Sequence, residues 1–279
     1  MRAFLFSLLL FFGTAQAQPL NVFVSVLPLK TFVEQVGGDH VDVHVMVQPG
    51  HSPATYSPSP KQIELLSRAH VFFRVGVPFE QSWLTKLSSI NPALVIIDTR
   101  QGITLQNLEE HGHGDSELDP HIWTSPVNVQ HMLDTIVDAL TELRPQYQSY
   151  FAQNARAYKS RLVELDGQMH ELLDNLSSRK FYVFHPAWGY FAHEYHLHQV
   201  AIEHEGKAPG AKSLARIMRQ AKQQGIKVIL VQPQFNINLA QRISDEIGGR
   251  VVMADPLSDD YINNLKRVSQ LIKEASSHE

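Results

Sequence analysis

Four residues with metal-binding side chains occupy comparable places along the chain, next to the ends of expected strands or the start of a helix. His185 immediately follows an expected strand at 180–184, and Asp255 immediately follows one at 250–254. His51 comes four residues after an expected strand at 40–47, and His121 precedes a helix expected to begin near Pro126. Ligands of parallel sheets bind where the loops after the strands converge. We therefore expect these four side chains, two from each half of the chain, to face one crevice.

Three imidazoles and one carboxylate form a donor set that suits a four-coordinate Zn²⁺ ion with bonds of about 2.0–2.2 Å. A closed set of this kind binds a metal but leaves no open position for a reactive water, so we expect no enzyme and no catalytic residue. The chain contains no cysteine, so a transition-metal site must be built from His, Asp or Glu. Each residue also has an ordinary alternative, such as a loop histidine, a strand-end residue or a turn acid before Pro256.

The residues around these positions alternate between short apolar strands and helices. Such alternation predicts an α/β fold with mainly parallel sheets flanked by helices. Expected strands lie at 21–27, 40–47, 70–75 and 93–98 in the first half and at 180–184, 199–203, 227–231 and 250–254 in the second. The pattern therefore predicts two α/β lobes of the same class.

A long helix is expected between the two lobes. Apolar or small residues recur from Phe151 to Leu176 at alternating spacings of four and three, which is the period of an amphipathic helix. From Pro145 to Leu176 such a helix would reach about 48 Å, more than a small domain needs. A coiled-coil strand, or two helices broken at Gly167, would give the same pattern. We expect a rigid connecting helix at 145–177, with lobes at 18–144 and 178–279.

The first 17 residues have the form of a secretory signal peptide. A basic start at Arg2 is followed by an apolar run and by a small-residue cleavage site that ends at Ala17. The apolar run is shorter than the roughly 20 residues of a membrane span. We therefore expect a periplasmic protein, cleaved after Ala17. A formal net charge of −4 gives no basic surface for nucleic acid.

Four segments together resemble the metal-ion solute-binding proteins of ABC transporters, the zinc and manganese uptake class. They are residues 49–58 (PGHSPATYSP), 119–123 (DPHIW), 185–191 (HPAWGYF) and 255–257 (DPL). The resemblance implies two α/β lobes with a metal bound between them. It also implies a monomer that captures a divalent ion and delivers it to a membrane permease driven by a cytoplasmic ATPase.

The chain departs from this family at two places. The family's first histidine ligand falls on Ala54, so His51, a water, Glu203 or His204 would have to complete the site. Gln232 stands where relatives often carry glutamate, and the sequence gives no account of its effect.

The expected cargo is Zn²⁺. Manganese-type relatives tend to carry a carboxylate at the place of His185, and imidazole favours the softer metal. A polar loop with His111 and His113 supports zinc, either as a loose collector or as a solvated loop tip. The alternatives are a manganese carrier, a zinc hydrolase with Glu203 as general base, and a siderophore or cobalamin binder. The chain contains no His-Glu-x-x-His run, which argues against a zinc hydrolase. Converging histidines argue against a siderophore or cobalamin binder, which has no use for them.

Overall fold

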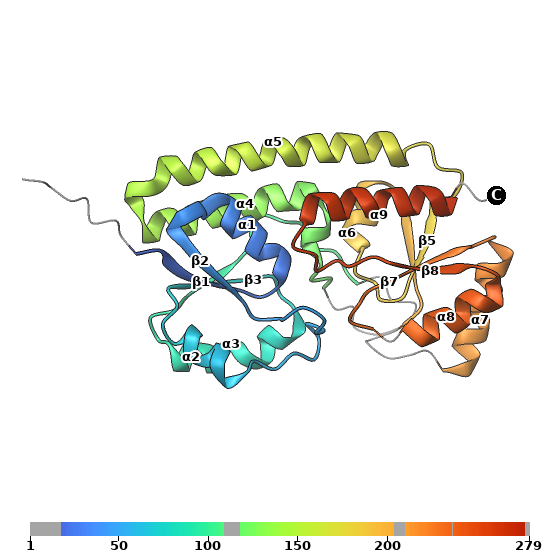
Figure 1. Cartoon of the computed structure of the whole chain (residues 1–279), viewed down its shortest axis with the longest axis horizontal. Coiled ribbons are helices and arrows are strands. Elements are labelled where there is room, and N and C mark those ends of the chain that lie inside the picture. Colours follow the sequence, from blue (N-terminus) through green and yellow to red (C-terminus); the bar gives the residue numbers. More distant parts are fainter. Residues whose placement is uncertain (1–17, 109–117, 204–209, 236, 277–279) are drawn as a thin grey trace, which may run out of the picture.

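The computed structural model describes residues 18–108, 118–203, 210–235 and 237–276. The N-terminal lobe holds a parallel sheet in the order β2-β1-β3-β4, and the C-terminal lobe holds a second parallel sheet in the order β6-β5-β7-β8. In both lobes the second strand of the lobe lies at one edge, followed by its first, third and fourth strands. The expected fold class is therefore confirmed: two α/β lobes with parallel sheets, joined by one long helix (Figure 1).

The N-terminal sheet lies between two layers of helices (Figure 1). Its strands are β1 (Leu20–Val24), β2 (Val41–Val45), β3 (Val71–Arg74) and β4 (Val95–Asp98). The helices are α1 (Leu27–Gly37) and α4 (Pro126–Leu143) on one side and α2 (Pro60–Leu66) and α3 (Pro78–Ile90) on the other. Short 3₁₀ turns at Gly38–His40 and Ile122–Thr124 precede β2 and α4.

The C-terminal sheet is built from shorter pieces. Its strands are β5 (Lys180–Val183), β6 (His198–Ala201), β7 (Val228–Val231) and β8 (Arg250–Met253). Its helices are α6 (Gly189–Glu194), α7 (Ala211–Gln223), α8 (Ile237–Ile247) and α9 (Tyr261–Ser276). Helices α7 and α8 cover the outer side of this sheet, whereas α9 lies beside the long helix (Figure 1).

The long helix α5 (Gln148–Leu173) follows a 3₁₀ turn at Pro145–Tyr147. Its 26 residues span about 39 Å. Gly167 lies inside the helix without breaking it, and a buried stripe from Phe151 to Leu173 packs on α4, α1 and α9. The helix ends at Leu173, three residues earlier than the periodicity indicated, and the backbone N–H of Asp174 makes the last helical hydrogen bond, to the His170 carbonyl.

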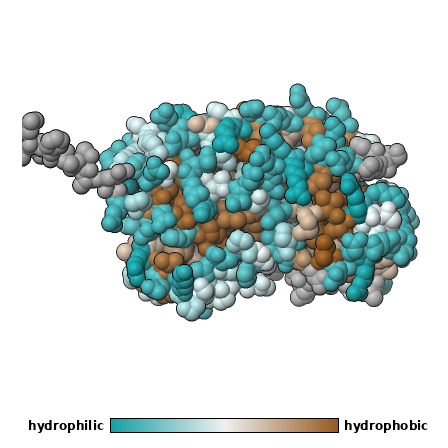
Figure 2. All heavy atoms as spheres, viewed as in Figure 1, coloured by the Kyte–Doolittle hydropathy of each residue, from teal (hydrophilic) through white to brown (hydrophobic). Residues whose placement is uncertain are grey.

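A single apolar core continues from the N-terminal lobe into the C-terminal one. It includes Phe32 and Leu133 of the first lobe, the buried stripe of α5, and Phe181 and Leu265 of the second. A separate, smaller core lies between the C-terminal sheet and helices α7 and α8. In Figure 2 hydrophobic residues form separate patches over both ends and the centre of the visible face, with hydrophilic residues between and around them. Among the described residues, no helix combines the length and apolarity that crossing a membrane would require.

Candidate metal site

His121 stands in the loop before α4, where its imidazole ring is fixed by a neighbouring carboxylate. Asp119 Oδ1 lies 2.6 Å from His121 Nδ1 and also accepts a hydrogen bond of 2.9 Å from the His121 backbone N–H. Both residues are buried. With Nδ1 engaged, Nε2 is the ring nitrogen left for a metal. Pairing of this kind fixes the tautomer of metal-binding histidines and raises their basicity.

His185 follows β5 and has a matching partner, Glu203, which follows β6. Glu203 Oε1 lies 2.5 Å from His185 Nδ1, and the glutamate side chain is buried. The pairing arises from strand register: Val183 lies opposite Ala201, so residues two positions beyond each strand end meet. Glu203 therefore lies on the Nδ1 side of the His185 ring, and Nε2 is again the ring nitrogen left for a metal.

Gln232, at the end of β7, holds the backbone of His185. Its Nε2 donates to the His185 carbonyl at 2.8 Å, and its Oε1 accepts from the His185 N–H at 3.3 Å. Gln232 is itself buried. An amide offers both a donor and an acceptor, whereas a glutamate carboxylate at this place would offer acceptors alone. This geometry gives Gln232 a positioning role that the sequence left without an account.

The rings of His121 and His185 meet edge to face, with centroids 5.2 Å apart. Both line one small pocket of about 20 Å³, enough for a single water-sized occupant. Phe235 stacks on the His185 ring with a centroid distance of 4.9 Å. Burial lowers the pKa of His185, an effect larger than the opposing hydrogen bond to Glu203. The neutral form, which binds metal, is therefore favoured.

Asp255 follows β8 at the edge of the same pocket. Its Oδ1 accepts hydrogen bonds from Gln234 Nε2 at 3.0 Å and from the Leu257 N–H at 2.9 Å. Gln234, Pro256 and Leu257 line the pocket, while the aspartate itself stands just outside the lining. Trp123 Nε1 donates to the Pro256 carbonyl at 2.8 Å and so ties the Asp255 loop to the His121 loop.

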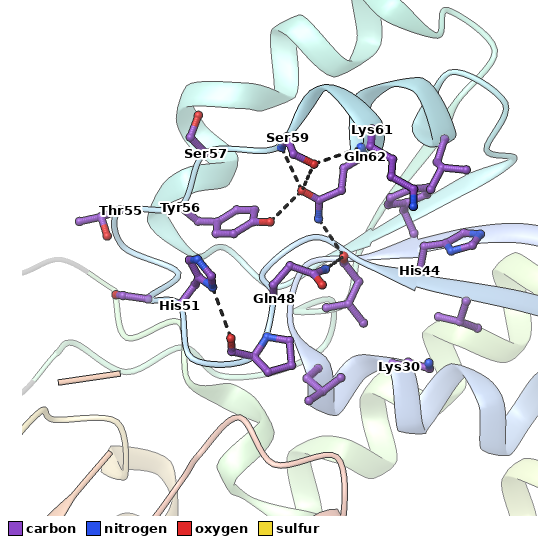
Figure 3. Close-up of a pocket in the computed structure, with 17 residues that line it drawn as sticks. Lys30, His44, Gln48, His51, Thr55, Tyr56, Ser57, Ser59, Lys61 and Gln62 are labelled. Atoms are coloured by element: carbon purple, nitrogen blue, oxygen red, sulfur yellow. Dashed lines mark hydrogen bonds between the residues drawn. The ribbon is translucent and has the colours of Figure 1, made fainter. Parts of the chain in front are cut away.

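His51 lies elsewhere. It is exposed and lines a separate open pocket of about 750 Å³, with its Nδ1 3.3 Å from the Pro49 carbonyl and its ring edge-on to Tyr56 (Figure 3). Of its neighbours, Ser52 lines both pockets and Pro53 lines only the pocket of His121 and His185. The structure thus brings His121 and His185 together with Asp255 beside them, and leaves His51 apart. The other histidines considered from the sequence, His111, His113 and His204, lie outside the described residues.

Asp119 was not identified from the sequence in this role, whereas Glu203 was considered as a ligand, as a general base, as a group that supports a ligand or as plain surface. Asp119 could have been found from its spacing two residues before His121, which is common in turns that fix a side chain. For Glu203 the equal offset from the two strand ends could not be seen in the sequence, because the expected strands ended at 184 and 203, whereas the observed ones end at Val183 and Ala201. Two imidazoles whose Nδ1 atoms are engaged by carboxylates, with a third carboxylate on the adjoining Asp255 loop, form a donor set whose chemistry suits Zn²⁺ as a bound substrate.

Comparisons with known proteins agree with this geometry. The family model described as "Zinc-uptake complex component A periplasmic" matches residues 22–275. The chain is 27% identical over 256 residues to the high-affinity zinc uptake system protein ZnuA of Bacillus subtilis, covering 87% of this chain and 80% of that one. It is 28% identical over 283 residues to the zinc-binding lipoprotein AdcA of Streptococcus pneumoniae, covering 93% of this chain but only 56% of the lipoprotein.

The chain is also similar to a crystal structure of a zinc-bound deletion mutant of ZnuA. The two superpose with a TM-score of 0.88 and 39% sequence identity, covering 94% of this chain and 99% of the other.

Proposed function

Because this chain belongs to the family of periplasmic component A of zinc-uptake complexes, we propose that it captures Zn²⁺ between its lobes and delivers the ion to an ABC-transporter permease with a cytoplasmic ATPase. The family's part in metal uptake makes the chain a solute-binding protein rather than an enzyme. The finer steps, Zn²⁺ in preference to Mn²⁺ and delivery to a permease, are our proposal. So are export to the periplasm as a monomer, cleavage after Ala17, and lobes at 18–144 and 178–279 around a connecting helix at 145–177.

The observation that carries the proposal is the pair of matched histidines. His121 and His185 each have Nδ1 engaged by a buried carboxylate, and their rings are 5.2 Å apart in one pocket. We propose that each donates Nε2 to Zn²⁺ and that Asp255 donates a carboxylate oxygen. Imidazole nitrogen at two of these places supports Zn²⁺ over Mn²⁺, which prefers oxygen ligands.

For the fourth donor we propose a water. His51 is the competing donor, and it would enter only if residues 48–58 shifted, because its ring lies in another pocket. We propose Glu203 as a partner of a ligand rather than a ligand itself, because its carboxylate lies on the Nδ1 side of the His185 ring, away from the proposed Nε2 donor.

The experiment is metal analysis of the purified chain lacking residues 1–17. We expect zinc in the crevice, tighter binding of Zn²⁺ than Mn²⁺ in titrations, and loss of this zinc in His121→Ala and His185→Ala. His131→Ala is the matched control, because His131 is exposed on α4. High-affinity zinc retained by both site variants would refute the site, and a higher affinity for Mn²⁺ would refute the choice of metal.

Delivery is tested in the bacterium that makes the chain. Deleting its gene is expected to stop growth in zinc-chelated medium, with rescue by the parent chain or by His131→Ala but not by His185→Ala. Equal rescue by all three forms would refute a role in uptake through this site. Hydrolysis of an ester or peptide by the zinc-loaded chain would favour the hydrolase instead.

A further inference from the structure

A second group of metal-binding side chains lies between α5 and α6, outside the pocket of His121 and His185. Asp166 and His170 are one turn apart on α5, and Glu194 is the last residue of α6. All three are partly buried, and one ligand atom from each lies within 4.8 Å of the other two. Residues four apart share one helix face, so both α5 side chains are directed toward α6.

The spacing is close to what one ion needs. Donors around a tetrahedral ion with bonds of about 2.0–2.2 Å are roughly 3.3–3.6 Å apart. His170 Nε2 stands 3.9 Å from Asp166 Oδ1, so small side-chain rotations would bring the atoms to bonding positions. No movement of either helix is required.

Two of the three side chains are oriented by a hydrogen bond, and the third has a carboxylate nearby. Tyr195 OH donates to Asp166 Oδ1 at 2.7 Å, and Ser125 Oγ donates to Glu194 Oε2 at 3.1 Å. The Nδ1 of His170 faces Asp174 Oδ1 at 3.6 Å, which leaves Nε2 toward the cluster. Outer partners of this kind fix the ligands of metal sites. The arrangement repeats, less tightly, the carboxylate–histidine pairs of the first site.

The charge of the cluster favours a cation. Two carboxylates surround one imidazole, with the carboxylate of Asp174 next to them. In the described part of the chain, the ion pairs that we find for Asp166 and Asp174 are with His170 alone. A divalent ion would neutralise the charge that the imidazole leaves unbalanced.

We propose that Asp166, His170 and Glu194 form a second, weaker binding site for a divalent transition-metal ion, with water filling the remaining positions. One nitrogen and two carboxylate oxygens give a harder and more exposed donor set than that of the first site. The second site therefore holds its ion less tightly and exchanges it with the surrounding solution.

The test isolates this site in a background that lacks His111, His113, His121 and His185. In His111→Ala/His113→Ala/His121→Ala/His185→Ala, checked for folding by circular dichroism, titration with Zn²⁺ is expected to show one remaining ion per chain. Adding His170→Ala or Glu194→Gln is expected to weaken this binding at least tenfold. His193→Ala is the control, because His193 is exposed on the same short helix as Glu194.

A second measurement uses the otherwise unchanged chain, in case the multiple variant does not fold. After dialysis against Zn²⁺ well above the first site's Kd, we expect about one ion more per chain in the parent and in His193→Ala than in His170→Ala. Loss of the tight ion in His185→Ala reports on the proposed function separately. Binding that His170→Ala and Glu194→Gln leave within twofold of the parent, or the absence of a second ion, would refute the second site.

Discussion

The carboxylate behind His185 offers the sharpest test of how the metal pocket works. Glu203 is 4% exposed, its Oε1 bonds the Nδ1 of His185, and its Oε2 is buried without a hydrogen-bond partner among the described residues. Glu203→Gln keeps the side-chain volume and one acceptor but removes the charge. A charge-assisted hydrogen bond is about twice as strong as a neutral one. In Glu203→Gln the imidazole of His185 is therefore held less firmly and becomes a poorer ligand for the metal.

Loss of an outer carboxylate of this kind typically lowers metal affinity by about 10–100-fold. We therefore expect the Kd for Zn²⁺ of Glu203→Gln to rise by that factor, or about 1.4–2.7 kcal/mol of binding free energy. Competition against a fluorescent zinc chelator at pH 7.5 measures the Kd even when binding is tight. Glu64→Gln is the matched control, because Glu64 is an exposed glutamate on α2.

A double-mutant cycle separates positioning from a general loss of stability. In a His185→Ala background, Glu203→Gln is expected to have little further effect on the Kd, because the imidazole that it orients is gone. Equal losses with and without His185 would mean that Glu203 acts elsewhere. A Kd for Glu203→Gln within twofold of the parent, together with a large loss in His185→Ala, would refute the positioning argument.

Four further predictions follow from the same geometry. His51→Ala is expected to leave the Kd for Zn²⁺ within about threefold of the parent value, because the His51 ring lies outside the pocket of His121 and His185. A tenfold loss of affinity in the same titration would show that the His51 loop moves into that pocket. Zinc affinity is to be measured from pH 7.5 to 5. Burial lowers the pKa of His185 below its ordinary value of 6.5, so protons are expected to displace the ion from this residue only below pH 6.5. A midpoint of the affinity loss at or above pH 6.5 would contradict this. Gln232→Ala removes both hydrogen bonds to the partly buried backbone of His185; the C=O still accepts from the Ala187 N–H, but the N–H loses its partner among the described residues. This variant is expected to lower the free energy of unfolding by about 1–3 kcal/mol in urea denaturation, whereas Gln168→Ala, at an exposed position of α5, is expected to change little. Free Zn²⁺ at 100 times its Kd is expected to raise the free energy of unfolding by about 2.7 kcal/mol, and His121→Ala/His185→Ala should remove most of this gain.

The fold could be predicted closely because its signals are local. Alternating apolar strands and helices predicted both sheets, and the spacing from Phe151 predicted α5. The ends were less certain, since propensity alone could not show that α5 stops at Leu173 and that α9 begins only at Tyr261. The continuity of the core through both lobes could not be predicted, because it depends on how α5 and α9 pack against α1 and α4.

The metal site was less accessible to sequence reasoning. Motifs selected His121, His185 and Asp255, but not the nitrogen that each imidazole uses, because that depends on partners fixed by strand register. His51 shows the limit of spacing arguments. It stands only one residue before Ser52, which lines the pocket, yet the loop directs its ring into another cavity.

The C-terminal sheet separates two apolar cores, so the two sides of this sheet need not unfold together. Along β5, Phe181 and Val183 enter the interior shared by both lobes, while Tyr182 and Phe184 enter the smaller one under α7 and α8. We therefore expect the α7–α8 layer to unfold locally, as one cooperative unit, while the rest of the molecule stays folded. Hydrogen exchange would register it as the segment that opens first.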